Sequence, residues 1–253
     1  MTWPRALGVS IAHVASDPPY LSPFVLPFEE PARDRREHFD LYPPTGSVAD
    51  RPVIVFLHGL YPASWRPSPR EWPTYVGYGA TAVASGVVGV VADVALHGPA
   101  DYPSAADVIG GIIDEVRRDA RVDSDRVAVW AFSGGGLLTG RWLSGSHPWL
   151  RCVALSYPVL APLQGWRVDR AFCPTDTLNG GAPPIVLTRV GRERPEIAAT
   201  VPAFLERAER LRVPLEVLDV AEGQHAFDSL DHTAASRDAV RSAFRLVVER
   251  LAG

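Results

Sequence analysis

Residues 127–136 read Val-Ala-Val-Trp-Ala-Phe-Ser-Gly-Gly-Gly, and they are the most informative part of this sequence. Its apolar first half predicts a buried strand, and the apolar residues 137–143 predict the start of a helix. Between them, residues 131–135 match the small-x-Ser-x-small pattern of a nucleophile elbow, a tight turn that exposes the Ser133 hydroxyl above the sheet edge. Ala131 and Gly135 are small enough to avoid a collision in that turn. The alternative is a glycine-rich loop in which Ser133 has no role.

The composition is typical of a globular chain with a sizeable core. Of 253 residues, 47% are hydrophobic and 21% are charged. A formal net charge of -4 gives no electrostatic reason to bind nucleic acid or an anionic membrane, so we expect neither as a partner. No stretch is apolar for long enough to span a bilayer. The two cysteines give no support for a disulfide and the first residues lack a signal-peptide layout, so we expect a cytoplasmic location.

The sequence contains no lysine, and this excludes several classes of enzyme. Schiff-base chemistry needs a lysine amine, and a Walker phosphate loop needs its own lysine. Paired cysteine motifs and a His-Glu-x-x-His stretch are absent as well, so zinc has no obvious ligands. No G-x-G-x-x-G motif follows a strand to bind a dinucleotide. We therefore expect no metal and no cofactor, and chemistry carried out by side chains alone.

Predicted strands and helices alternate along the chain. Apolar or alternating runs predict strands at 37–42, 53–57, 87–92, 127–131, 153–156, 185–190 and 215–220, with a further strand near 7–14. Helical spacing predicts helices at 75–85, 104–120, 197–211 and 240–251. This order is typical of an α/β fold with a mostly parallel central sheet and helices on both faces. We expect one domain over residues 1–253, in which 157–183 form a loop or a small cap.

A serine hydroxyl is a weak nucleophile until a base takes its proton, and a carboxylate normally orients that base. In sites built on a nucleophile elbow, the order along the chain is serine, acid, histidine. His225 follows the predicted strand 215–220, at the carboxyl edge where the catalytic groups of parallel sheets gather. We therefore assign His225 as the base that activates Ser133.

The acid should lie on the loop after the predicted strand 185–190. Glu193 is the first choice on that loop, and Glu196 is the second. Asp169 and Asp176, which follow the preceding strand, are the remaining alternatives.

An acyl-transfer site also needs hydrogen-bond donors aimed at the developing oxyanion. The amide of Gly134, next to the nucleophile, is one donor by position, and the loop after strand 53–57 should supply the other from Leu60 or, as the second choice, Tyr61. Aromatic residues in the loops at the carboxyl edge predict an apolar substrate pocket lined by Tyr61, Trp65, Tyr157, Trp166, Phe172 and Phe227.

Together these motifs resemble the α/β-hydrolase fold and, more narrowly, the dienelactone hydrolase family. The resemblance runs from about Asp40 to Leu251 and rests on Val-Phe-Leu-His-Gly (55–59), Ala-Phe-Ser-Gly-Gly-Gly (131–136), Arg-Val-Gly-Arg-Glu-Arg-Pro (189–195) and Gly-Gln-His-Ala-Phe-Asp (223–228). The chain departs from that family by carrying Ser133 where cysteine is the nucleophile, Ala131 where the elbow has glycine, and Glu193 where aspartate is usual. The resemblance implies a serine esterase-like member that needs no cofactor.

Three functions are consistent with these residues. The first is a serine hydrolase that cleaves a small to medium ester, lactone or thioester through Ser133, His225 and Glu193 and an acyl-enzyme. The second keeps the pocket but carries out cyclisation, elimination or acyl transfer to an acceptor other than water. The third is a catalytically silent small-molecule binder, since one fold hosts many functions.

Overall fold

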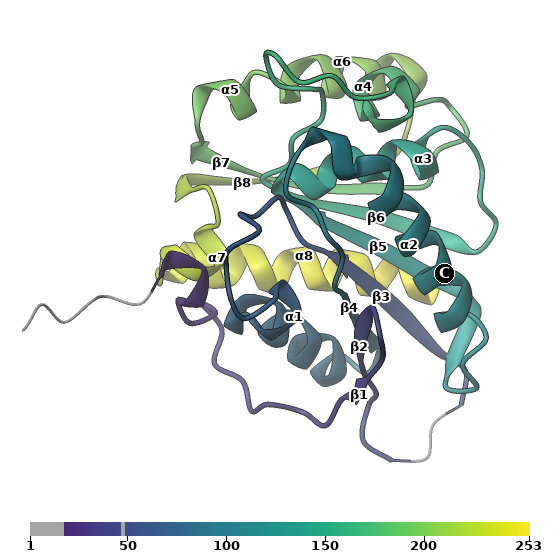
Figure 1. Ribbon diagram of the computed structural model, residues 1–253. Helices are drawn as coiled ribbons and strands as arrows, with labels where there is room; N and C mark the ends of the chain where they lie inside the picture. Colours follow the sequence, from purple (N-terminus) through teal and green to yellow (C-terminus); the bar gives the residue numbers. More distant parts are fainter. Residues whose placement is uncertain (1–17, 47–48) are drawn as a thin grey trace, which may run out of the picture.

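The computed structural model describes residues 18–46 and 49–253, and the strand expected near 7–14 lies outside them. Its centre is an eight-stranded sheet with the order β1-β2-β4-β3-β5-β6-β7-β8 (Figure 1). At one edge β1 (Asp34–Arg35) pairs antiparallel with β2 (Phe39–Tyr42), which pairs antiparallel with β4. All other neighbours are parallel: β3 (Arg51–Leu57), β4 (Val88–Ala92), β5 (Val122–Phe132), β6 (Leu150–Ser156), β7 (Ile185–Arg192) and β8 (Leu215–Gln224).

The buried parts of the central strands are apolar because both faces of the sheet are covered there. Every residue of β4 is buried, and β3 is buried from Val53 to Leu57. Alternate residues of β5 enter opposite cores, as the two-residue period of a strand requires. Val127, Val129 and Ala131 enter one core, while Ala128, Trp130 and Phe132 enter the other.

Helices cover both faces of this sheet (Figure 1). One face packs against α1 (Pro73–Ala84), the short α7 (Phe227–Leu230) and α8 (Ala234–Ala252). The other packs against α2 (Tyr102–Val116), α3 (Gly140–Leu143), α5 (Pro195–Ala198) and α6 (Val201–Leu211). Within the described residues, no helix combines the length and apolar character needed to cross a membrane.

Some elements differ from their predicted form. The segment after Ser133 begins as a 3-10 helix, η4 (Ser133–Thr139), before the single turn of α3. The helix predicted over 197–211 is divided into α5 and α6, and Pro202, which cannot donate a backbone hydrogen bond, lies in the first turn of α6. Segment 157–183 is irregular except for η5 (Arg170–Phe172) and α4 (Pro174–Thr177). Three further 3-10 helices are η1 (Pro19–Leu21), η2 (Pro69–Glu71) and η3 (Pro99–Asp101).

Candidate active site

Ser133 lies at the turn between β5 and η4, with a positive φ of 50°. This left-handed conformation is unfavourable for a residue with a Cβ atom, and such strain collects at functional sites. The turn is also closely packed. A Cβ atom on Gly135 would lie 2.5 Å from the His58 carbonyl oxygen, so only glycine fits there without movement of the backbone. The predicted elbow is therefore a strained turn held against the loop that follows β3.

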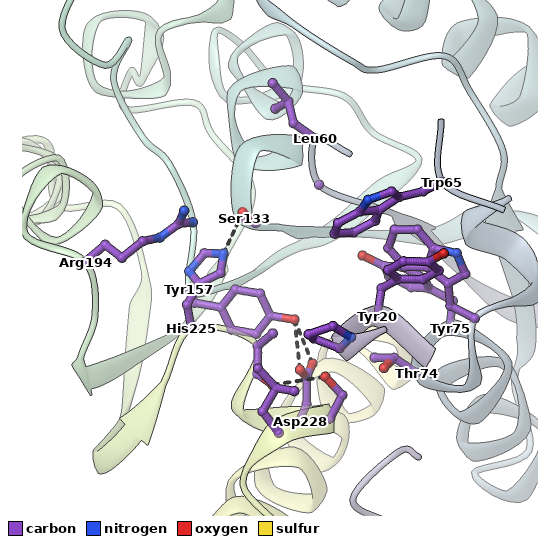
Figure 2. A pocket seen from close by; sticks show the side chains of 16 residues that line it. Tyr20, Leu60, Trp65, Thr74, Tyr75, Ser133, Tyr157, Arg194, His225 and Asp228 are labelled. Carbon is purple, nitrogen blue, oxygen red and sulfur yellow. Dashed lines mark hydrogen bonds between the residues drawn. The ribbon is translucent and has the colours of Figure 1, made fainter. Parts of the chain in front are cut away.

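His225 lies between Ser133 and Glu193 and makes a hydrogen bond to each. Figure 2 shows the bond to Ser133. Its Nε2 atom is 2.8 Å from Ser133 Oγ, and its Nδ1 atom is 2.7 Å from Glu193 Oε2. A carboxylate can only accept, so Nδ1 carries the proton and Nε2 faces the serine hydroxyl as an acceptor. The Glu193 side chain is 6% exposed, and its other oxygen accepts from the Arg194 amide at 2.7 Å.

The other carboxylates that the sequence offers lie elsewhere. Glu196 is exposed on α5, and Asp169 caps η5 by accepting from the Ala171 amide at 2.8 Å. Asp176 lies in α4. Among residues 18–46 and 49–253, the carboxylate hydrogen-bonded to His225 is that of Glu193. The structure thus brings together the three residues that the sequence nominates as nucleophile, base and acid.

The two residues expected to supply amides to an oxyanion, Gly134 and Leu60, lie close to each other. A Cβ atom on Gly134 would come within 2.0 Å of Leu60 Cδ1. Gly134 is the second residue of η4, so its amide has no partner within the helix. The Tyr102 phenol fixes this peptide by donating to the Gly134 carbonyl oxygen at 2.8 Å.

Of the two amides considered for the second donor, only one is available. The Tyr61 amide already donates to the Leu96 carbonyl at 3.1 Å. The Leu60 amide donates no backbone hydrogen bond in the part of the chain that the structure describes.

His58 holds the loop after β3 in place through two hydrogen bonds. Its Nδ1 atom lies 2.8 Å from the Gly59 carbonyl oxygen, its Nε2 atom accepts from the Val94 amide at 3.3 Å, and burial lowers its pKa.

A cavity of about 310 Å³ opens in front of Ser133 and His225 (Figure 2). Its wall contains several aromatic side chains, two of which, Trp65 and Tyr157, are predicted pocket residues. The Trp65 ring stacks on Tyr20 with centroids 4.1 Å apart. The polar groups of the wall include Thr74, Arg194 and Asp228.

The other four predicted pocket residues, Tyr61, Trp166, Phe172 and Phe227, do not line this cavity. Tyr61 is buried and packs edge-on against His97. Trp166 and Phe172 lie against Tyr102 in the core on the opposite face of the sheet. Phe227 is buried behind Tyr157, with ring centroids 5.9 Å apart. These loops do follow strand ends, but a loop can turn towards either face of the sheet.

Sequence reasoning missed several residues of the wall, among them Tyr20, Trp72, Tyr75 and Asp228. Asp228 is fully buried, and burial raises its pKa to about 6. Its carboxylate accepts hydrogen bonds from the phenols of Tyr78 and Tyr157, each at 2.9 Å. A signal for it was present, because Asp228 stands three residues after His225. No group of three or more His, Cys, Asp or Glu side chains suited to a metal ion occurs within the described residues.

Known proteins resemble this chain in fold rather than in sequence. No family model matches it, and no curated protein matches it in sequence. The thermophilic esterase Est2 of the planctomycete Thermogutta terrifontis is 21% identical, with a TM-score of 0.66 over 83% of this chain and 87% of that one. The same esterase phosphoramylated by tabun is 18% identical, with a TM-score of 0.69 over 87% of this chain and 96% of that one.

An α/β hydrolase from a Medee basin deep-sea metagenome library, MGS-M1, is 15% identical, with a TM-score of 0.68 over 88% of this chain and 98% of that one. The narrower resemblance to dienelactone hydrolases stays a prediction. The strand order, the helices on both faces and these structural neighbours together establish that the chain has the α/β-hydrolase fold.

Proposed function

We propose that this chain is a serine hydrolase that cleaves a small to medium carboxylic ester, lactone or thioester. The observation that carries the proposal is the hydrogen-bonded series from Ser133 Oγ through His225 to Glu193, at the wall of a cavity. A weak hydroxyl becomes a nucleophile in this arrangement because the imidazole can take its proton as the new bond forms.

In the proposed mechanism, Ser133 Oγ attacks the substrate carbonyl carbon while His225 Nε2 takes the hydroxyl proton. Glu193 stabilises the imidazolium that results, and the amides of Gly134 and Leu60 donate to the oxyanion. The tetrahedral intermediate then collapses, and His225 returns the proton to the leaving alkoxide or thiolate. Water attacks the acyl-enzyme by the same route and releases the acid.

The size and walls of the cavity support a small to medium substrate. A volume of about 310 Å³ is at the lower end of small-molecule sites, and the aromatic wall favours an apolar group. Segment 157–183 contributes no helix longer than the four residues of α4, which is too little for a large lid. The Thermogutta esterase has been solved with butyrate and with propionate bound, and this supports a short acyl group for the present chain as well.

The test is covalent labelling followed by a substrate panel. A fluorophosphonate probe should modify the purified chain once, on Ser133, and mass spectrometry of the digested protein should locate the adduct. Ser133→Ala should abolish the label, while Ser144→Ala, at an exposed serine after α3, should keep it. A folded protein that is labelled elsewhere, or not at all, would refute the proposal. Esters, lactones and thioesters of matched acyl length then separate hydrolysis from other reactions of the same pocket.

A further inference from the structure

Among the residues that the structure describes, Asp40 and Asp228 are the two fully buried aspartates, and their hydrogen-bond and charge partners differ. Asp40 lies within 3.7 Å of the guanidinium groups of Arg33, Arg35 and Arg70. Asp228 has no cationic hydrogen-bond partner in the described residues, and its carboxylate accepts from the phenols of Tyr78 and Tyr157. A buried carboxylate without a cation is costly. A stabilising effect on the fold therefore does not explain why an aspartate is present at position 228.

Tyr157 connects Asp228 to His225 (Figure 2). Its phenol oxygen is 2.9 Å from both carboxylate oxygens of Asp228. Its backbone amide donates to the Thr188 carbonyl at 2.8 Å. The tyrosine is therefore held at both ends. Its ring packs against the His225 imidazole, with centroids 4.8 Å apart and an angle of 63° between the rings.

Tyr157 also belongs to the site by its position in the sheet. The neighbouring parallel strands β5, β6, β7 and β8 each place the first residue past the strand end at the same edge. Those residues are Ser133, Tyr157, Glu193 and His225. Positive φ values occur at Ser133, Tyr157 and Ala226, and in the described chain only two other non-glycine residues share them, Asp50 and Arg212. Backbone strain is thus concentrated around His225, as is typical of functional sites.

We propose that Tyr157, anchored by Asp228, is a positioning residue that holds the His225 imidazole in line with Ser133 and Glu193. The bonds to Ser133 and Glu193 hold the imidazole at its two nitrogen atoms, and hydrogen bonds alone resist a tilt of the ring out of their line only weakly. A ring packed at 63° against the imidazole restricts that tilt. The catalytic consequence rests on the proposed function, but the positioning itself does not.

The chain offers a matched pair of variants to test this. Tyr157→Phe and Tyr78→Phe each remove one buried phenol that donates to Asp228 at 2.9 Å. The Tyr78 ring, however, packs among Phe56, Trp130 and Phe244 and not against His225. We expect Tyr157→Phe to lower kcat on a short ester by about 10- to 100-fold with little change in KM, because a small misplacement of a catalytic group has effects of that order. Tyr78→Phe should stay within about threefold of the parent rate.

A second measurement does not depend on turnover. In protein labelled with ¹⁵N-histidine, the His225 Nδ1 proton that is shared with Glu193 should give a downfield NMR signal, which His225→Ala identifies by its loss. Tyr157→Phe should shift or broaden this signal, and Tyr78→Phe should leave it in place. If Tyr157→Phe does not fold, Asp228→Asn replaces it and should show the same changes. Equal effects of the matched pair on kcat and on the NMR signal would overturn the positioning role. Failure of Ser133 labelling would refute the proposed function alone, because the NMR comparison would still decide the positioning.

Discussion

Replacing Asp228 by asparagine should raise the unfolding free energy relative to that of the parent protein, and this gain should be larger at pH 8 than at pH 4. Burial of Asp228 raises its pKa from the usual 3.8 to about 6, and this outweighs the opposing effect of the hydrogen bonds from Tyr78 and Tyr157. Between these two values the folded protein holds the proton more tightly than the unfolded chain does. The contribution of this carboxyl to stability is therefore present below pH 4 and is lost as the pH rises through 6.

The size of the effect follows from the pKa difference. A shift of about two units corresponds to about 3 kcal/mol, at 1.36 kcal/mol per unit. About 2 kcal/mol of this falls between pH 4 and pH 8, because the unfolded carboxyl is already partly ionised at pH 4. The uncharged amide of the variant removes this pH dependence. The difference in unfolding free energy between Asp228→Asn and the parent should thus change by about 2 kcal/mol in favour of the variant over that range.

Urea unfolding of both proteins at pH 4, 5, 6 and 8 measures this difference, and titration of groups common to both cancels in it. Asp40→Asn is the control at the other buried carboxyl. At pH 8 it should lower stability, because it leaves Arg33, Arg35 and Arg70 around a neutral amide. The difference in unfolding free energy between Asp228→Asn and the parent could instead stay constant within about 0.5 kcal/mol from pH 4 to pH 8. That result would refute this account of the buried charge, because it is well below the effect expected from the pKa shift.

Three further outcomes are expected. Turnover of a p-nitrophenyl ester should fall about a million-fold in Ser133→Ala and in His225→Ala, and hardly further in the double variant; losses that multiply would show that the two residues act separately. Glu193→Gln should cost about ten thousand-fold in kcat, and a nearly unchanged rate would remove Glu193 from the mechanism. Short p-nitrophenyl esters should be cleaved faster than long ones, without activation by detergent micelles, whereas a preference for long chains with interfacial activation would point to a lipase.

The strands could be predicted from the sequence wherever helices cover both faces of the sheet. The apolar runs 53–57, 127–131 and 153–156 are parts of β3, β5 and β6, because a strand covered on both faces must be apolar throughout. β1 was missed, since its two residues, Asp34 and Arg35, are charged and lie at the edge of the sheet. This strand is defined by its pairing with β2, and no local sequence pattern predicts it. The single domain, the absence of a cofactor and the cytoplasmic location stay predictions.

The site could be predicted in part because chain order and strand ends carry information about it. Ser133, His225 and Glu193 each follow a predicted strand, and parallel strands bring their carboxyl ends to one edge. The pocket was harder to predict, because a strand end specifies an edge of the sheet and not a face. Trp166 and Phe172 turn to the face of α2, whereas the cavity is walled by Tyr20 and Trp65 on the other side.

The ends of β7 and β8 explain why Glu193 and His225 can be held precisely although the apolar pattern stops short of them. The predicted strands end at 190 and 220, just after the ion pair between Arg189 and Asp219, but the pairing continues as far as Arg192 opposite Gln224. This polar extension contains a register shift after Val190, where a Cβ atom on Gly191 would lie 1.9 Å from the Ala221 carbonyl oxygen. Hydrophobic periodicity cannot detect such a ladder, because its side chains are polar and exposed. Yet it places the acid and the base directly after paired strands instead of on long loops, and a hydrogen bond of 2.7 Å between them depends on that.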